Sequence, residues 1–152
     1  MSVEVRLIAV EPAPTAVVAA TTTWKEFPSQ WGPMLDKVWA FLRADAQVVP
    51  KDGHNVMLYL DDAPHVEVGV QVSGPFVPAG DVTPSRLPGG LVATATHNAP
   101  IQRIGETHDA VVAWCAHNGH RLSRVRWEVY GDPDASGQFA VEVYWSVLAP
   151  GR

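Results

Sequence analysis

Apolar and polar residues alternate along much of the chain, and this period of two is typical of β-strands, whose side chains point to opposite faces in turn. The first stretch already shows it at Val3, Val5 and Leu7. Short turns at residues 61–64 (DDAP) and 131–137 (GDPDASG) predict that the last two strands of each half form a hairpin. The predicted strands are residues 3–10, 15–22, 54–60, 65–72, 89–97, 122–130 and 138–148.

Two further stretches place apolar residues three and four positions apart, which predicts amphipathic helices. Pro28 and Ser29 precede the first stripe, at a typical helix start. Asn118 and Gly119 end the second with residues that tolerate a left-handed backbone. The order strand, helix, strand, strand therefore occurs twice. The two stripes are Trp31, Met34, Leu35, Val38 and Leu42, and Ile101, Ile104, His108, Val111 and Cys115.

A comparison of the two halves favours a duplication. The string VMLYLDDAPHVEVGV lies over RWEVYGDPDASGQFAVEVYW, which places Tyr59 on Tyr130 and Glu67 on Glu142. Residues 72–90 are rich in proline and glycine and show neither period, so we predict a connector there. A length of 152 residues fits one domain, with repeat one over residues 1–73, a linker over 74–88 and repeat two over 89–150.

Composition excludes several classes of protein. The hydrophobic share of 47% and the charged share of 18% argue against a disordered chain, and no apolar run approaches the ~20 residues of a membrane span. The start, MSVEVRLIAVEPAP, lacks the pattern of a secretory signal, so we expect a cytoplasmic protein. The net charge is −5, and no cluster of Lys and Arg with interleaved aromatics occurs, which argues against nucleic-acid binding.

The cysteine and the histidines predict neither a disulfide nor a metal site. Cys115 is the only cysteine, so it cannot form an internal disulfide. His117 and His120 flank the predicted end of a helix, so they need not converge with Glu106 and His108 on one ion. We therefore expect no metal and no cofactor.

Parity sorts the side chains of the second-half strands onto two faces. Arg126, Glu128 and Tyr130 share one face of their strand, and Glu142 and Tyr144 share one face of the next. The hairpin register is expected to place Tyr130 opposite Glu142 and Glu128 opposite Tyr144. The apolar faces, which we expect to lie beneath the helices, comprise Val125, Trp127, Val129, Val141, Val143 and Trp145, and in the first half Val56, Leu58, Leu60, Val66, Val68 and Val70.

The first half repeats this pattern, with Met57 and Tyr59 expected on the same face as Glu67. Acids and aromatic rings would then alternate over one surface of the sheet. A ring face attracts a cation by ~0.5–2 kcal/mol, and a partly desolvated carboxylate adds charge and direction. The pattern predicts a ligand site, while the alternative is an ordinary sheet surface, where exposed Glu and Tyr are common.

The second half carries a family resemblance in the strings LPGGLVATATHNAPIQRIGETHDAVVAWCAHNGHRL, RWEVYGDP and AVEVYWSVL. They resemble the GyrI-like small-molecule-binding domain, also described as the effector-binding domain of some AraC-type and MerR-type transcription regulators, over essentially the full length. Its most specific part is the Glu-x-Tyr at Glu128 and Tyr130. The resemblance implies an α+β fold of two βαββ repeats with pseudo-twofold symmetry, antiparallel sheets with helices on one face, and a central ligand cleft where Glu128 contacts cationic, aromatic compounds.

Two features depart from the family pattern. The turn His97-Asn98-Ala99-Pro100-Ile101 lacks the usual glycine and following aromatic residue, so the mouth of the cleft is expected to differ. No helix-turn-helix pattern precedes or follows the domain, so we expect a stand-alone member that does not bind DNA by itself.

The first expected function is the binding or sequestration of a hydrophobic or cationic aromatic compound. Trp31 has packing beneath the sheet as its alternative role, and His97 has capping of backbone groups. The expected ligand-binding residues are Glu128, Glu142, Tyr144, Tyr130, Tyr59, Glu67, Met57, Trp24, Trp31 and His97.

The second function is enzymatic, because the resemblance includes stand-alone members that hydrolyse cyclopropane-bearing, DNA-alkylating toxins. Glu128 would orient or deprotonate a water while Tyr130 polarises the ligand, and the sequence does not distinguish turnover from binding. The third function is a protein-binding modulator of gyrase, for which no docking strand stands out. The favoured partner is a small molecule, with no nucleic acid and no membrane, and a homodimer is allowed.

Overall fold

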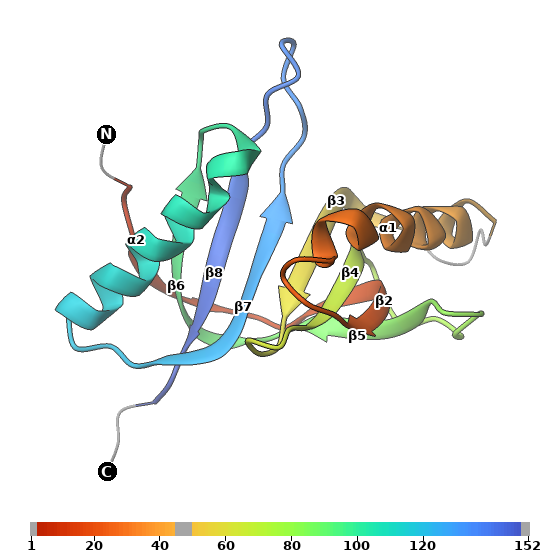
Figure 1. Cartoon of the computed structure of the whole chain (residues 1–152). Coiled ribbons are helices and arrows are strands. Elements are labelled where there is room, and N and C mark those ends of the chain that lie inside the picture. Colours follow the sequence, from red (N-terminus) through yellow and green to blue (C-terminus); the bar gives the residue numbers. More distant parts are fainter. Residues whose placement is uncertain (1–2, 45–49, 150–152) are drawn as a thin grey trace.

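The computed structural model describes residues 3–44 and 50–149, and Figure 1 shows how its elements are arranged. Apart from β5, the helices and strands form where the two hydrophobic periods predict them, with shifts of a few residues at their ends. In chain order the elements are β1 (Arg6–Val10), β2 (Ala13–Thr21), α1 (Phe27–Ala44), β3 (Pro50–Tyr59), β4 (His65–Val72), β5 (Thr83–Leu87), β6 (Gly90–His97), the 3₁₀ turn η1 (Ile101–Arg103), α2 (Ile104–His117), β7 (Leu122–Tyr130) and β8 (Val141–Val147).

The eight strands form one antiparallel sheet in the order β1-β6-β8-β7-β3-β4-β2-β5. Both predicted hairpins, β3–β4 and β7–β8, are confirmed. Strands β3 and β7 pair at the centre, where Met57 lies opposite Glu128, so the sheet continues from one half of the chain into the other. Strands β1 and β2 are neighbours in the sequence, yet β1 pairs with β6 at one edge and β2 lies between β4 and β5.

The predicted connector between the halves contains an edge strand. Strand β5 pairs with β2, with Ser85 opposite Thr15. Pro84 lacks a backbone N–H, which a strand tolerates at the edge of a sheet. The many proline and glycine residues in this segment interrupt the alternation of apolar and polar residues by which a strand is predicted. The expectation of a connector without a strand was therefore wrong for residues 83–87.

The ends of both helices agree with the local sequence signals. Helix α1 begins at Phe27, directly before Pro28, whose fixed backbone angle suits a first helical turn. Helix α2 ends at His117, and Gly119 adopts a φ of 76°, the left-handed conformation that glycine tolerates best. The predicted stripe of α1 is buried at Met34, Val38 and Leu42, whereas Trp31 is 40% exposed.

Both helices cover the same face of the sheet. Helix α1 packs on β2 and β4, helix α2 packs on β6 and β8, and Figure 1 shows β3 and β7 between them. Residues directly opposite in neighbouring strands share a face, so the pairs Val68–Met57, Met57–Glu128 and Glu128–Val143 carry one face from α1 to α2. The expectation of an α+β fold with helices on one face is confirmed.

The expected assignment of side chains to the two faces was wrong at the centre of the sheet. Val125, Trp127 and Val129, expected beneath the helices, lie on the opposite face, and so do Val56 and Leu58. That face also carries a buried apolar core, to which β1, β2, β5 and β6 contribute residues. This second core contains Val56, Leu58, Leu87, Val92 and Trp127, with Ile8, Val10, Ala13, Val125, Val129 and Tyr144 packed around them.

Over residues 3–44 and 50–149, neither helix has the length and apolar character that crossing a membrane requires.

Two glycine-to-alanine substitutions test the packing of the sheet. A Cβ at Gly69 in β4 would lie 1.8 Å from the backbone oxygen of Ala16 in β2, so Gly69→Ala forces the two strands apart and is expected to lower the free energy of unfolding by about 2–3 kcal/mol. Gly105→Ala is the matched control, because its Cβ would enter open space on α2 and is expected to stabilise the helix by about 0.5–1 kcal/mol. Urea unfolding measures both, and equal stabilities would contradict the strand spacing described.

Candidate functional site

A buried carboxylate lies at the centre of the sheet, between the two helices. Glu128 of β7 is only 3% exposed and lies opposite Met57 of β3 on one side and Val143 of β8 on the other. Its side chain points to the helix-covered face, as the pairing of these residues requires. An ionised carboxylate in such a position needs hydrogen-bond donors to replace water.

Three donors from three different elements surround Glu128. The Tyr59 hydroxyl of β3 and the Tyr130 hydroxyl of β7 donate to Oε1, at 2.9 and 2.7 Å. The His108 ring of α2 places Nε2 2.7 Å from Oε2. The Met57 sulfur lies 3.6 Å from both tyrosine hydroxyls and forms an apolar wall beside them. We call Glu128, Tyr59, Tyr130 and His108 the Glu128 cluster.

Trp145 of β8 fixes the protonation of His108. Its indole nitrogen, which can only donate, lies 3.0 Å from His108 Nδ1. Nδ1 must therefore accept, so the ring proton is on Nε2 and His108 donates it to Glu128 as a neutral imidazole. Among the described side chains, no Lys or Arg forms an ion pair with Glu128. The carboxylate therefore accepts three hydrogen bonds, all from neutral groups.

The two tyrosines stay neutral donors over a wide pH range. Burial raises the pKa of the Tyr59 hydroxyl well above its ordinary value, and the negative charge of Glu128 adds to the effect. Burial likewise raises the pKa of Tyr130, again with a contribution from Glu128. A phenolate next to the carboxylate would place two negative charges in contact, so both hydroxyls keep their protons.

A cation and three aromatic rings adjoin the Glu128 cluster. The Arg126 guanidinium lies 5.3, 5.8 and 5.1 Å from the ring centroids of Trp24, Tyr59 and Trp145, which we call the aromatic box. Arg126 Nη1 donates to the Asp62 carboxylate at 2.8 Å, and Trp24 Nε1 donates to the Asp62 backbone oxygen at 3.1 Å. Arg126 is 8% exposed, so the rings and Asp62 replace most of its water.

Glu142, Tyr144 and Glu67 do not join the Glu128 cluster, contrary to the expected register. Val143 lies opposite Glu128 in the β7–β8 ladder, and Tyr144 lies opposite Trp127. A shift of one residue moves a side chain to the other face of the sheet. Placing Val143 and Trp145 beneath α2 thus sends Glu142 and Tyr144 to the opposite face.

On that opposite face the three residues have other partners. Glu142 accepts hydrogen bonds from Thr96 Oγ1, Tyr144 stacks on Trp127 with ring centroids 5.4 Å apart, and Glu67 accepts from Ser85. Glu67 lies there because it is paired with Leu58 and Ala19, whereas Met57 and Tyr59 face the helices. The expectation that Glu67 shares their face was wrong.

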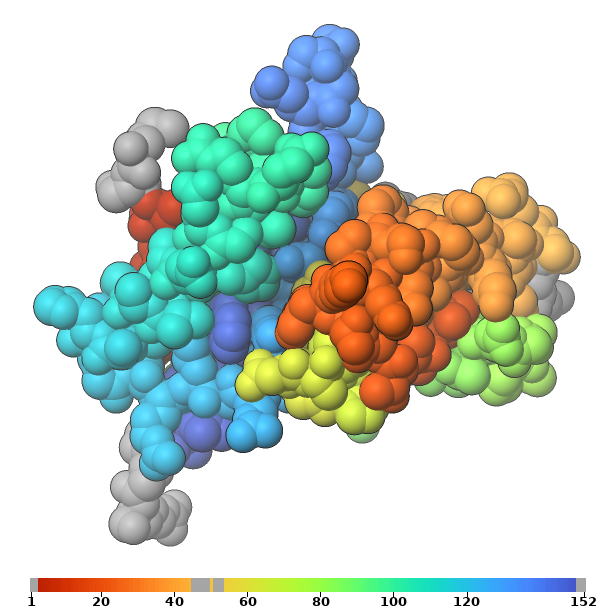
Figure 2. All heavy atoms as spheres, viewed as in Figure 1, coloured from red at the N-terminus to blue at the C-terminus, as the bar shows by residue number. Residues whose placement is uncertain are grey.

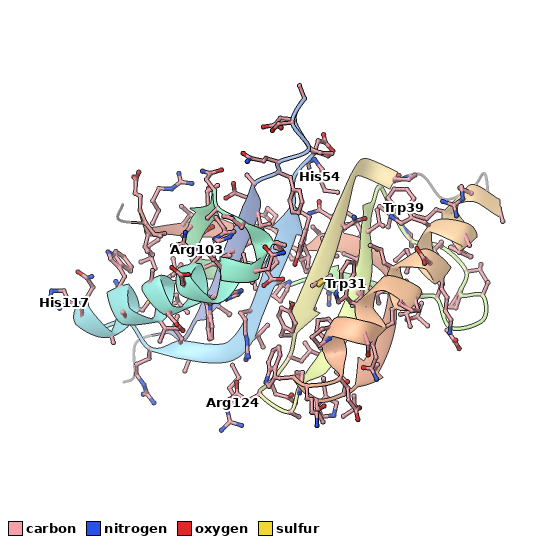
Figure 3. All side chains as sticks on the ribbon, turned by 45° about the horizontal axis from the view of Figure 1, so that its top comes forward. Trp31, Trp39, His54, Arg103, His117 and Arg124 are labelled. Atoms are coloured by element: carbon pink, nitrogen blue, oxygen red, sulfur yellow. The ribbon has the colours of Figure 1, made fainter. Side chains whose placement is uncertain are left out.

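The remaining expected residues lie in different surroundings. Trp24, 46% exposed, contacts Tyr59 with ring centroids 5.4 Å apart. Trp31 lies on the side of α1 that faces β3, as Figure 3 shows. His97 is buried, with Nδ1 2.7 Å from Thr107 Oγ1 and Nε2 2.9 Å from the Pro100 oxygen, so it fixes the turn before α2.

Four cavities in the described part of the chain do not include Glu128 in their lining. One of about 660 Å³ includes His97 and Thr107 in its lining, and one of about 570 Å³ lies between the turn at Asn98 and the loop at Phe139. Glu128 lines neither of these, nor the cavities beside Lys37 and beside Arg86. Figure 2 shows a furrow in the surface between α1 and α2, with the β7 and β8 region at its floor. Glu128 is itself buried, and its strand β7 belongs to the floor of this furrow.

Sequence reasoning missed His108, Trp145 and Arg126. His108 lies in the apolar stripe of α2, where a single histidine is the signal of a polar contact within the core. Arg126 shares the parity of Glu128 and Tyr130, which indicates its position, but nothing local reveals its aromatic neighbours. No group of three His, Cys, Asp or Glu side chains within the described part of the chain could hold a metal ion.

Comparison with known proteins agrees with this architecture. A model of the GyrI-like small molecule binding domain matches residues 4–148. The chain belongs to this family. No protein with a curated description matches the sequence.

Several solved structures share the fold of this GyrI-like chain. The EcmrR C-terminal domain has a TM-score of 0.81 at 16% identity, covering 99% of this chain and 100% of that domain, and the chain spans 58% of EcmrR in a complex with DNA. SAV2435, solved bound to tetraphenylphosphonium, has a TM-score of 0.62 at 13% identity, with 96% and 94% covered. A Listeria innocua hydrolase encoded by lin2189 has a TM-score of 0.60 at 11% identity, with 97% and 93% covered. Identities this low show a common fold alone.

Alkaline titration tests the environment of the tyrosines. Burial raises the pKa of all three, including Tyr144, so the folded protein keeps phenolic protons that the unfolded chain loses above the ordinary pKa of 10.0. Stability is therefore fully present below pH 10 and is expected to fall above it, by about 1.4 kcal/mol per pH unit for each tyrosine that stays protonated. Phenolate absorbance at 295 nm should rise together with unfolding. Three tyrosines titrating near pH 10 in the folded protein would contradict the geometry.

Proposed function

We propose that this chain binds a small organic cation at Glu128, beneath the furrow between α1 and α2. The observation that carries the proposal is the carboxylate itself, which is buried and hydrogen-bonded only to neutral donors. Its hydrogen bonds offset part of the cost of burial, but no Lys or Arg of the described residues contacts the carboxylate to compensate its charge directly. A cation that reaches the cluster supplies that compensation.

The side chains around Glu128 favour a large, delocalised cation over a small, hydrated one. Tyr59 and Tyr130 border the carboxylate, and Trp24 lies against Tyr59. Trp39 of α1 reaches the sheet beside them, donating to Asn55 of β3 at 2.9 Å. Aromatic faces attract weakly hydrated cations, and such cations lose little free energy when water leaves them. The proposed ligand is therefore a lipophilic aromatic cation.

A protein of the same fold supports the choice of ligand class. SAV2435 was solved with tetraphenylphosphonium, a lipophilic cation, and shares the fold over 96% of this chain. That compound is a suitable probe because it carries one delocalised charge and no hydrogen-bond donor. Binding would then depend on the carboxylate and the rings alone.

We also propose that the fold arose by duplication of a β-α-β-β unit. On each side of the central β3–β7 pair, the strands follow the same order toward the edge of the sheet. Next to β3 come its hairpin partner β4, then β2, which precedes α1, and then the edge strand β5. Next to β7 come its hairpin partner β8, then β6, which precedes α2, and then the edge strand β1. The proposed ligand would lie where the two units meet, which explains why both contribute to the Glu128 cluster.

Two isosteric substitutions test the binding site. Glu128→Gln removes the buried charge and is expected to weaken tetraphenylphosphonium binding at least about tenfold, since loss of one partner of a buried charge pair costs 2 kcal/mol or more. Glu142→Gln is the matched control, with the same charge change one strand away on the opposite face, and should alter the affinity less than about twofold. Isothermal titration calorimetry measures both. A loss of affinity in Glu128→Gln no larger than that in Glu142→Gln would remove Glu128 from the site.

A second candidate function, hydrolysis, is favoured by the contact of Tyr130 with Glu128. A carboxylate and a phenol in one buried site can orient a water and polarise a strained electrophile, the roles expected of Glu128 and Tyr130. The hydrolase from Listeria innocua shares the fold at 11% identity, which says nothing about this chain's chemistry.

Turnover separates the two candidates. If the site only binds, as we expect, each protein chain should protect one molecule of a cyclopropane-bearing alkylator from ring opening. Ring-opened product in excess of the protein, followed by mass spectrometry and lost in both Glu128→Gln and Tyr130→Phe, would establish hydrolysis instead.

A further inference from the structure

The aromatic box already holds a cation that belongs to the chain. The Arg126 guanidinium lies within 6 Å of the ring centroids of Trp24, Tyr59 and Trp145. Three rings around one positive charge form the kind of cage that proteins use to bind organic cations. The box therefore has the chemistry of a ligand site and is occupied from within.

The box and the Glu128 cluster share side chains. The ring of Tyr59 contacts Arg126 while its hydroxyl donates to Glu128. Trp145 contacts Arg126 with its ring while its indole nitrogen holds His108, the third donor to Glu128. A large cation that binds at Glu128 must therefore contact the same rings as Arg126.

Like charges add to this competition. Arg126 and Glu128 are two positions apart on one face of β7, which separates them by about 7 Å along the strand. A second cation at Glu128 would thus meet the positive charge of Arg126 in a place where little water screens it.

The polar partners of Arg126 belong to residues that are not buried. Its ion pair is with Asp62, whose side chain is 67% exposed and lies in the turn between β3 and β4. Arg126 Nη1 also donates to the backbone oxygens of Asp61, at 3.3 Å, and Arg124, at 2.9 Å, and neither of these residues is buried. All three acceptors lie in residues that are not buried, so Arg126 can leave the rings without depriving a deeply buried partner of its hydrogen bond.

We propose that Arg126 is a tethered competitor: it occupies the aromatic box in the free protein, and a lipophilic cation bound at Glu128 displaces it. The inference rests on the proposed function and extends it to specificity. Only a cation whose aromatic surface replaces the contacts of the guanidinium binds, so small hydrated cations are rejected.

Calorimetry with tetraphenylphosphonium tests the competition. Arg126→Gln empties the box of its charge and is expected to tighten binding about tenfold. Arg121→Gln is the matched control, because it removes the same charge from an exposed residue just before β7 and should change the affinity less than about twofold. Weaker binding by Arg126→Gln than by the natural protein would overturn the proposal.

A measurement on the unaltered protein avoids any dependence on how the variant folds. Three ring faces around the guanidinium should shift the Arg126 Hε and Hδ resonances upfield in NMR spectra. Saturation with tetraphenylphosphonium should return them toward the positions of a solvated arginine. Unchanged Arg126 resonances at full saturation would overturn the proposal.

A probe of the same shape and opposite charge excludes an anion-binding role for Arg126. Tetraphenylborate should bind neither the natural protein nor Arg126→Gln. Its binding by the natural protein and loss in Arg126→Gln would make Arg126 an anion contact and overturn the competition.

The Glu128→Gln variant separates this proposal from the proposed function. If Glu128→Gln abolishes binding while Arg126→Gln weakens it, cation binding stands and the competition alone fails. If neither the natural protein nor Arg126→Gln binds tetraphenylphosphonium, both proposals fail together.

Discussion

The hydrogen bonding of one buried carboxylate constrains the centre of this molecule. Glu128 accepts from Tyr59 on β3, from Tyr130 on its own strand and from His108 on α2, so its satisfaction requires that β3 pairs with β7 and that α2 covers them. Loss of His108 leaves Oε2 without this donor, which costs about 1–3 kcal/mol or more for a charged group, whereas Oε1 keeps one tyrosine if the other is lost. The interaction that joins the two halves of the chain is therefore the same interaction that builds the candidate site.

The second core, on the face away from the helices, decides which side chains reach that site. Trp127 is 2% exposed there, packed with Val56 and Leu58, and its size fixes the register of β7 against β3. A slip of one residue would drive Glu128 into this apolar core and send Trp127 toward the helices. Packing around Trp127 on one face of the sheet thus positions Glu128 on the other face. A substitution that shifts the register of β7 therefore affects both faces together.

The sequence predicts the features that depend on local periodicity. Both helices and both hairpins follow from spacing and turn residues, and parity alone places Arg126, Glu128 and Tyr130 on one face. The pairing of strands depends on contacts between residues far apart in the sequence. The sequence therefore predicted neither strand β5 nor Val143 as the residue opposite Glu128 in the β7–β8 hairpin. The role of His108 was hidden for the same reason, since its donor and acceptor partners lie 37 and 20 residues away.

The arrangement of charges argues for function rather than stability. Arg126 and Glu128 are neighbours on one strand face, and a direct ion pair would neutralise both within the core. The chain instead turns Arg126 to the exposed Asp62 and surrounds Glu128 with neutral donors, one of them held neutral by Trp145. A fold selected for stability alone has no need of such a separation, because an unpaired buried charge is costly. Local choices that oppose stability are expected at functional sites, and here they leave a negative charge and a set of aromatic rings that an incoming cation can use together.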